Sequence, residues 1–132
     1  MVQAQLGYAA DREGNGVAYA RLTTQTGERL VRAAFRVQRF SGLGGREVGY
    51  AALTAVASLL FERGIKAVAF YVPDAGVVDD RATQSSVPPP LVLPYVRLGC
   101  ALNRFERYSL EPCASSDLSA RAQAEVVFHS AA

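Results

Sequence analysis

The stretch from Lys66 to Asp80, KAVAFYVPDAGVVDD, decides the fold of this chain. Its first half contains an uninterrupted apolar run from Ala67 to Val72, which is typical of a central strand covered on both faces. The run leads into Asp74, and the residues after it predict a short helix that begins near Val77. A carboxylate at the end of a buried strand is costly to desolvate, so it usually has a structural or a chemical role.

Three strand-like segments precede this stretch. The first alternates in polarity from Val2 to Tyr8, the second runs from Val17 to Thr24, and the third runs from Arg29 to Gln38. The turn sequences between them, DREGNG and QTGE, contain residues that tolerate positive φ. The pattern predicts an antiparallel meander whose third strand presents Arg32 and Arg36 on its outer face.

The remaining segments alternate between helix and strand. Two apolar stripes predict a buried helix from Arg46 to Gly64. A second helix follows the proline-rich segment SSVPPP and ends within LNRFERY, a short strand covers Tyr108 to Glu111, and a last helix covers Leu118 to Phe128. The element order is therefore β-β-β-α-β-α-β-α, which we interpret as one α/β domain over residues 1–132.

Composition limits the classes of partner and site. Half of the 132 residues are hydrophobic, and the formal net charge of +2 is too small to argue for a nucleic-acid partner by itself. Cys100 and Cys113 form no CxxC pair and His129 is the only histidine, so no zinc site is predicted. No secretory signal and no apolar run of membrane length is visible, so we expect a cytoplasmic protein with no membrane contact.

The element order and the strand-end aspartate resemble the ribonuclease H-like family, in particular its short bacterial stand-alone members. The resemblance implies a mixed five-stranded sheet of order 3-2-1-4-5 flanked by helices. Enzymes of this family hydrolyse the RNA strand of RNA–DNA hybrids with two divalent metal ions held by about four carboxylates. The sequence DAGVV from Asp74 matches the family's motif at strand four, and DLSA from Asp117 resembles its motif at the last helix.

The other two carboxylate positions of the family hold no acid. The aspartate of strand one falls on Gly7 by strand phase, or on Ala9 by counting back from the Asn-x-Gly pattern, and the helix glutamate falls on Gly49. Asp74 and Asp117 alone would hold no more than one weakly bound Mg²⁺. We therefore expect a degenerate domain with no nuclease activity and no cofactor, in which both aspartates have the alternative role of helix caps.

Three functions follow from this interpretation. The favoured one is binding of RNA, DNA or a hybrid through the third strand, with candidate residues Arg32, Arg36, Arg29 and Arg39; a solvated strand edge is the structural alternative. The second is an active metal-dependent nuclease that uses Asp74, Asp117 and one further acid, for which the candidates are Asp11, Glu47 and Asp79. The third is a protein-interaction module, such as a homodimer formed through the exposed edge of strand three or five.

Overall fold

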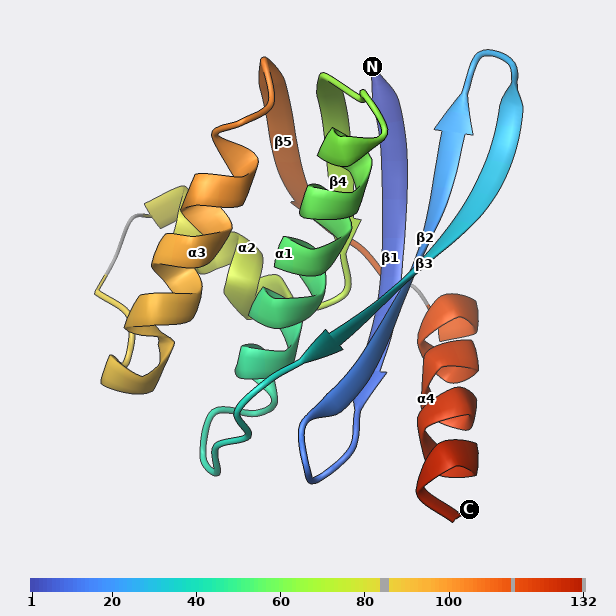
Figure 1. The fold of residues 1–132 in the computed structure, drawn as a ribbon. Helices are drawn as coiled ribbons and strands as arrows, with labels where there is room; N and C mark the ends of the chain where they lie inside the picture. Colours follow the sequence, from blue (N-terminus) through green and yellow to red (C-terminus); the bar gives the residue numbers. More distant parts are fainter. Residues whose placement is uncertain (84–85, 115, 132) are drawn as a thin grey trace.

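The computed structural model describes residues 1–83, 86–114 and 116–131. Ten elements follow one another along the chain (Figure 1). In order they are β1 (Val2–Ala10), β2 (Asn15–Thr24), β3 (Gly27–Arg36), α1 (Arg46–Glu62), β4 (Ala67–Val72), α2 (Ala75–Thr83), the 3₁₀ turn η1 (Pro89–Leu91), α3 (Val92–Leu102), β5 (Arg107–Pro112) and α4 (Ser116–Ala131). The order predicted from the sequence is confirmed, with one addition: the short helix expected near Val77 is a separate element, α2, between β4 and α3. α2 begins at Ala75, and β3 starts and ends two residues earlier than expected.

The five strands form one mixed sheet of order β3-β2-β1-β4-β5, as the resemblance implied. β1 pairs antiparallel with β2, and β2 pairs antiparallel with β3 through the two tight turns. β1 and β4 are parallel, with Gln3 opposite Ala69 and Gln5 opposite Tyr71. β4 and β5 are also parallel. β3 and β5 are therefore the two edges of the sheet.

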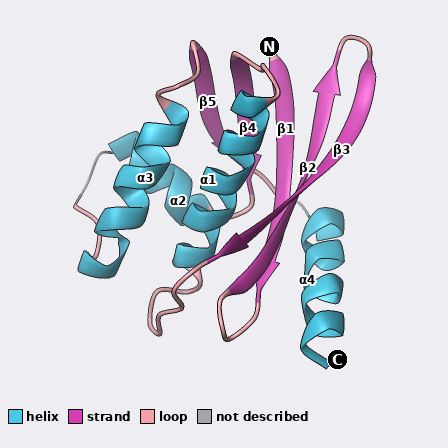
Figure 2. Ribbon diagram, in the orientation of Figure 1, coloured by secondary structure: helices cyan, strands magenta, loops and turns pink. Residues whose placement is uncertain are grey.

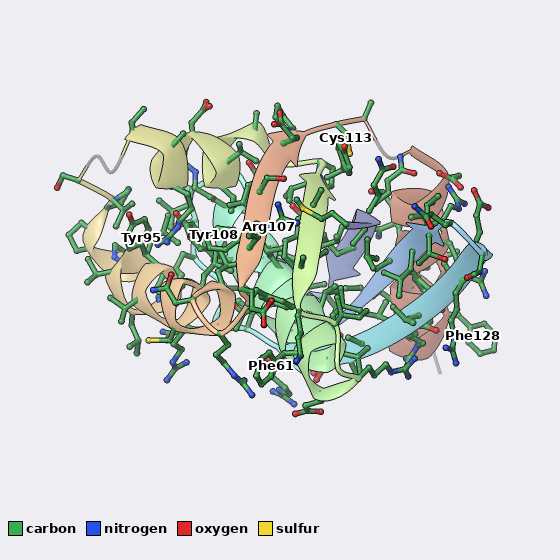
Figure 3. All side chains as sticks on the ribbon, turned by 90° about the horizontal axis from the view of Figure 1, so that it is seen from above. Phe61, Tyr95, Arg107, Tyr108, Cys113 and Phe128 are labelled. Atoms are coloured by element: carbon green, nitrogen blue, oxygen red, sulfur yellow. The ribbon has the colours of Figure 1, made fainter. Side chains whose placement is uncertain are left out.

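Helices cover both faces of the sheet (Figure 2). On one face, α1 packs beside α3 and over β1, β2 and β3, around a core that includes Leu6, Tyr50 and Phe70. On the other face, α4 packs mainly against β1 and β2, over a smaller core. Its members are Ala9, Val17, Tyr19, Leu118, Ala122 and Val126. Tyr95 of α3 and Phe128 of α4 accordingly lie at opposite sides of the molecule (Figure 3).

Alternation along β1 assigns each side chain to one of these two layers. Ala4, Leu6 and Tyr8 belong to the α1 layer, whereas Ala9 belongs to the α4 layer. Gly7 also faces α4, because a Cβ at this position would lie 2.4 Å from the backbone nitrogen of Ser119. A glycine is thus required at Gly7 for the close approach of α4 to the sheet.

No helix within the described ranges has the length and apolarity needed to cross a membrane.

Candidate functional site

The strand-end aspartate forms the N-terminal cap of a helix. Asp74 follows β4, and its Oδ1 accepts a hydrogen bond of 2.8 Å from the backbone N–H of Gly76, at the start of α2. This bond satisfies one of the amide donors that the first turn of a helix leaves without a partner. The capping role that the sequence offered for Asp74 is therefore present in the structure, at the carboxyl end of a central strand.

Two other residues meet Asp74 on the α1 side of the sheet. A Cβ placed on Gly49, in the second turn of α1, would lie 2.9 Å from Oη of Tyr8 and 3.3 Å from Oδ2 of Asp74. It would also lie 3.0 Å from Cγ2 of Val77. Gly49 is thus surrounded by the Tyr8 phenol, the Asp74 carboxylate and α2, and no larger side chain fits there unless a neighbour moves.

The Tyr8 hydroxyl is buried and makes no hydrogen bond to any described residue. Its burial, together with the negative charge of Asp74, raises the pKa of the phenol well above its ordinary value. Tyr8 is therefore neutral across the physiological range. An unpaired polar group in a packed site is costly, so this hydroxyl contributes no stability in the form the structure shows.

The strand-one position that faces Asp74 is Tyr8, and neither Gly7 nor Ala9 is close to it. Both of those residues face α4, on the opposite side of the sheet. Gly7, expected from the strand phase, and Ala9, expected from counting back, each differ from Tyr8 by one residue. A shift of one residue along a strand turns the side chain to the other face, so both expected positions face away from Asp74. Gly49, in contrast, lies beside Asp74 where the helix position was expected.

A basic side chain completes the surroundings of Asp74. A Cβ on Gly76 would lie 2.8 Å from Nε of Arg46 and 3.1 Å from Oδ1 of Asp74, so the guanidinium and the carboxylate lie close together. Arg46 also donates to both carboxylate oxygens of Asp80, at 3.3 and 3.4 Å, and Tyr50 donates to Asp80 at 2.6 Å. Asp80 is buried and the Arg46 side chain is 33% exposed, so this is a partly buried, hydrogen-bonded ion pair.

The sequence analysis did not identify Tyr8, Arg46 or Asp80 as part of this site. One signal was available for Asp80, which falls three residues after Val77 and therefore on the buried side of α2. An acid on a buried helix stripe indicates an ionic partner inside the fold. No comparable signal identified Tyr8, because its alternation with apolar neighbours is that of an ordinary core residue.

Three of the remaining candidate acids have partners elsewhere, and the fourth, Asp79, lies on the exposed side of α2. Asp117 pairs with Arg21 of β2, Glu47 pairs with Arg39, and Asp11 accepts the backbone N–H groups of Glu13 and Asn15 in the β1–β2 turn. The arginine and the turn amides lower the pKa values of Asp117 and Asp11, respectively. Across residues 1–83, 86–114 and 116–131, no three side chains of the histidine, cysteine, aspartate and glutamate types gather where they could hold a metal ion.

The four candidate arginines of β3 and its continuation do not form one cluster. Arg32 is held by Glu125 of α4 through three hydrogen bonds of 3.0 to 3.2 Å. Arg39 donates to Glu47 and to the carbonyl oxygens of Ala10 and Asp11, at 3.3 and 2.8 Å. Arg29 and Arg36 are seven residues apart in one strand, which places their backbones about 23 Å apart.

Comparison with solved structures identifies the architecture. The chain resembles ribonuclease H1 from the archaeon Halobacterium salinarum at a TM-score of 0.72 and 19% identity, over 97% of this chain and 98% of that one. It resembles the N-terminal ribonuclease H domain of a Mycobacterium tuberculosis protein at a TM-score of 0.72 and 18% identity, over 99% of this chain and 98% of that one. It also resembles the LC11 ribonuclease H1 in complex with an RNA/DNA hybrid, at 0.69 and 12%, over the full length of both.

No protein-family model and no curated protein matches the sequence. The structural matches cover nearly the whole chain, include the same sheet order, and persist at identities below 20%. The chain therefore has a ribonuclease H-like fold, in which Tyr8, Gly49 and Asp74 meet where β1 and β4 separate beside α1.

Proposed function

We propose that this protein is a non-catalytic ribonuclease H-like domain that binds nucleic acid. The observation that carries the first half of the proposal is the meeting of Tyr8, Gly49 and Asp74. Two-metal hydrolysis requires carboxylates that bridge and flank a pair of ions about 4 Å apart. Here one carboxylate, one neutral phenol and one residue without a side chain share that space.

The residues around Asp74 do not fit a pair of divalent cations. Oδ1 of Asp74 already accepts the Gly76 amide, and the guanidinium of Arg46 lies beside it. The Arg46 guanidinium is paired with Asp80, and its positive charge on this side of Gly76 disfavours a divalent cation at Asp74. We therefore assign Asp74 a capping role and derive no chemical step through a metal.

The support for nucleic-acid binding comes from the fold and from the arginines at one end of the sheet. A protein of the same fold, the LC11 ribonuclease H1, was solved in complex with an RNA/DNA hybrid. Arg39 contacts Ala10 and Asp11, so the end of β3, the β1–β2 turn and the loop before α1 lie together. Arg36 lies at this end and has no ion pair with any described residue, whereas Arg29 lies at the far end of β3.

The positions of these arginines refine the predicted surface. Arg36 is the arginine best placed to contact phosphate, because its guanidinium is exposed and has no carboxylate partner in the described chain. Arg32 can contribute only if its bond to Glu125 opens, and Arg39 is held by Glu47. We therefore expect Arg36 to contribute most and Arg32 less, and we expect no contribution from Arg29 at the far end of β3.

Fluorescence anisotropy titrations against single-stranded RNA, duplex DNA and an RNA–DNA hybrid test this proposal at several salt concentrations. Each phosphate contact that is lost should lower the salt slope by about one unit. Arg36→Ala should weaken binding and reduce the slope, while the matched variant Arg29→Ala on the same strand should change neither. Absence of binding to all three nucleic acids would contradict the proposal, and a mass that rises with protein concentration in sedimentation would then favour a homodimer.

A further inference from the structure

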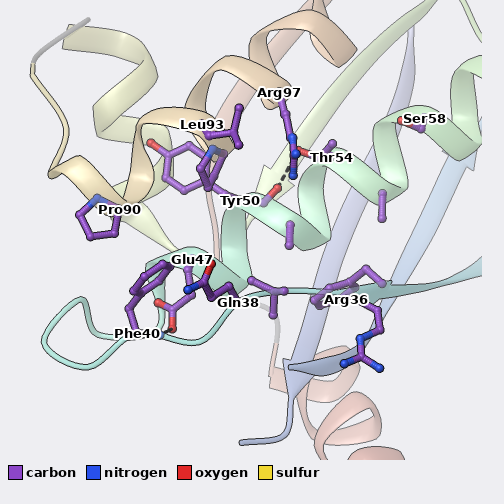
Figure 4. Close-up of a pocket in the computed structure, with 15 residues that line it drawn as sticks. Arg36, Gln38, Phe40, Glu47, Tyr50, Thr54, Ser58, Pro90, Leu93 and Arg97 are labelled. Atoms are coloured by element: carbon purple, nitrogen blue, oxygen red, sulfur yellow. Dashed lines mark hydrogen bonds between the residues drawn. The ribbon is translucent and has the colours of Figure 1, made fainter. Parts of the chain in front are cut away.

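A groove outside the Asp74 site lies between the end of β3, the outer side of α1 and the start of α3 (Figure 4). Its volume is about 370 Å³, which is within the range of small-ligand sites. Its lining includes Phe35, Phe40, Glu47, Thr54, Leu93 and Arg97. Neither Tyr8, Gly49 nor Asp74 lines it, so the groove is separate from the site described above.

The groove combines flat apolar walls with polar groups at separate places. Phe40, Pro90 of η1 and Pro94 of α3 supply the apolar walls, and Thr54 and Arg97 supply polar groups on the other side (Figure 4). The guanidinium of Arg36 points away from α1, so the backbone of that residue, and not its charge, borders the groove. Arg97 is therefore the cation placed to meet a ligand in the groove.

A buried acid without a full set of partners lies at the end of the groove near Phe40. Glu47 is 0% exposed, and its Oε2 accepts the backbone N–H of Phe40 at 3.0 Å and Nε of Arg39 at 3.1 Å. Its Oε1 is buried and accepts no hydrogen bond from any described residue. Burial by itself raises the pKa of Glu47, but the hydrogen bonds from the Phe40 amide and from Arg39 act against burial, and the pKa is lowered, so the carboxylate is ionised at neutral pH.

An ionised oxygen held out of water without a donor is among the costliest groups to bury. A ligand that brings an N–H donor to this end of the groove would remove that cost. The oxygen is covered in the structure, so the ligand must displace part of the cover. Gln38 is exposed and Phe40 is half-buried, and these two side chains line the groove next to Glu47.

We infer that the groove binds an unpaired nucleobase, which donates an amino or ring N–H to Oε1 of Glu47, packs against Phe40 and directs its phosphate toward Arg97. Carboxylates accept hydrogen bonds from base amino groups, and aromatic side chains stack on bases of any sequence. The inference deepens and rests on the proposed nucleic-acid function, because it names the part of the nucleic acid that enters the protein. The ligand is a nucleotide, either free or within a single strand.

The test compares adenine with purine, which lacks the exocyclic amino group. Adenosine monophosphate and the corresponding purine nucleotide are titrated as free ligands, and short single strands containing one base or the other are titrated in parallel. We expect the adenine ligand of at least one pair to bind roughly tenfold more tightly, because purine leaves the Glu47 charge without its donor. Equal affinity within both pairs would overturn the inference.

Two variants separate this site from general phosphate binding. In Glu47→Gln, the amide oxygen must still accept the Phe40 N–H, so the amide NH₂ takes the place of Oε1 and the preference for adenine should disappear. In Ala51→Leu, one helical turn from Glu47, the added side chain should fill the groove and reduce affinity roughly tenfold or more. Ala120→Leu, on the exposed side of α4, is the matched control and should bind as the wild type does.

The outcomes also distinguish the two proposals. Salt-dependent binding of nucleic acid that Ala51→Leu leaves unchanged, together with no binding of free adenosine monophosphate, would overturn the groove site and leave the arginine surface standing. Binding of free adenosine monophosphate, lost in Ala51→Leu, without binding of any strand would support the groove and contradict the nucleic-acid function. Binding of neither the nucleotide nor a strand by folded protein would overturn both. Thermal unfolding of each variant establishes that the protein titrated is folded.

Discussion

A side chain added at Gly49, beside Asp74, should crowd the Tyr8 hydroxyl and destabilise the fold. In Gly49→Ala the new methyl carbon would lie 2.9 Å from Oη of Tyr8 and 3.0 Å from Cγ2 of Val77, whereas ordinary contacts of this kind are about 3.5 to 4.0 Å. The neighbours must therefore move by roughly half an ångström or more. Overpacking of this kind costs about 1 to 3 kcal/mol.

The helix itself opposes this cost. Alanine is favoured over glycine in a helix interior by about 0.8 to 1 kcal/mol, so we expect Gly49→Ala to lower the free energy of unfolding by a net ~1 kcal/mol. Tyr8→Phe removes the hydroxyl that makes the closest contact, and it also removes a buried polar group without a partner. Tyr8→Phe alone should therefore leave the free energy of unfolding unchanged or raise it. In the Tyr8→Phe background, Gly49→Ala should lower the free energy of unfolding by about 0.5 to 1 kcal/mol less than it does in the wild type.

Urea unfolding of the wild type, both single variants and the double variant measures this coupling, with m-values compared to establish a common two-state transition. Ala51→Gly, two residues along the same helix, is the control for helix propensity and should cost about 1 kcal/mol. A different result would refute this prediction: Gly49→Ala raises the free energy of unfolding by the whole helix preference of alanine over glycine, and its effect is additive with that of Tyr8→Phe. Tyr8 would then not restrict the space beside Gly49.

Three further predictions concern the carboxylates and the edges of the sheet. Asp74→Ala should lower stability by about 0.5 to 2 kcal/mol through loss of the α2 cap, whereas added Mg²⁺ should leave the melting temperature of the wild type unchanged; a metal-dependent rise that the variant loses would show that Asp74 is a ligand. The lowered pKa of Glu47 means that the bonds its carboxylate accepts, from the Phe40 amide first and then from Arg39, contribute fully above the ordinary value of 4.5 and are lost as the pH falls through the lower, folded value. The difference in unfolding midpoint between the wild type and Glu47→Gln should therefore be constant near neutral pH and shrink below about pH 4.5, and a difference independent of pH would exclude this contribution. Glu125→Ala frees Arg32 and should strengthen nucleic-acid binding and raise its salt slope, while unchanged titrations would remove Arg32 from the surface.

Much of the architecture was predictable because it depends on local patterns. Alternation in β1 and β2, the tight turns and the apolar run of β4 predicted the meander and a strand inside the sheet. The run of β4 also predicted cover on both faces, but only the alternate residues Val68, Phe70 and Val72 are buried, because α4 lies over β1 and β2. The sheet order came from the family resemblance, and it is confirmed. The sequence predicted that α2 begins near Val77, two residues after its observed start at Ala75. The helix begins earlier because Asp74 caps it by accepting the backbone N–H of Gly76, whereas the prediction relied on the apolar residues that follow.

The site was less predictable because it depends on contacts between distant residues. The facing residue on β1 depends on how many residues the turn before Asn15 contains, and an error of one position moves the answer from Tyr8 to a residue on the opposite face. Arg32 is exposed, as expected, but it is paired with Glu125, 93 residues away in α4. Periodicity identifies which face a side chain takes and cannot identify the charge that lies opposite it.

The most direct test of the central claim is incubation of the purified protein with a labelled RNA–DNA hybrid in the presence of Mg²⁺ or Mn²⁺. The meeting of Tyr8, Gly49 and Arg46 around Asp74 predicts that the RNA strand remains intact at protein concentrations that saturate any binding. Metal-dependent cleavage that disappears in Asp74→Asn would contradict the account, because it would show that the site assembles a working pair of metal ions.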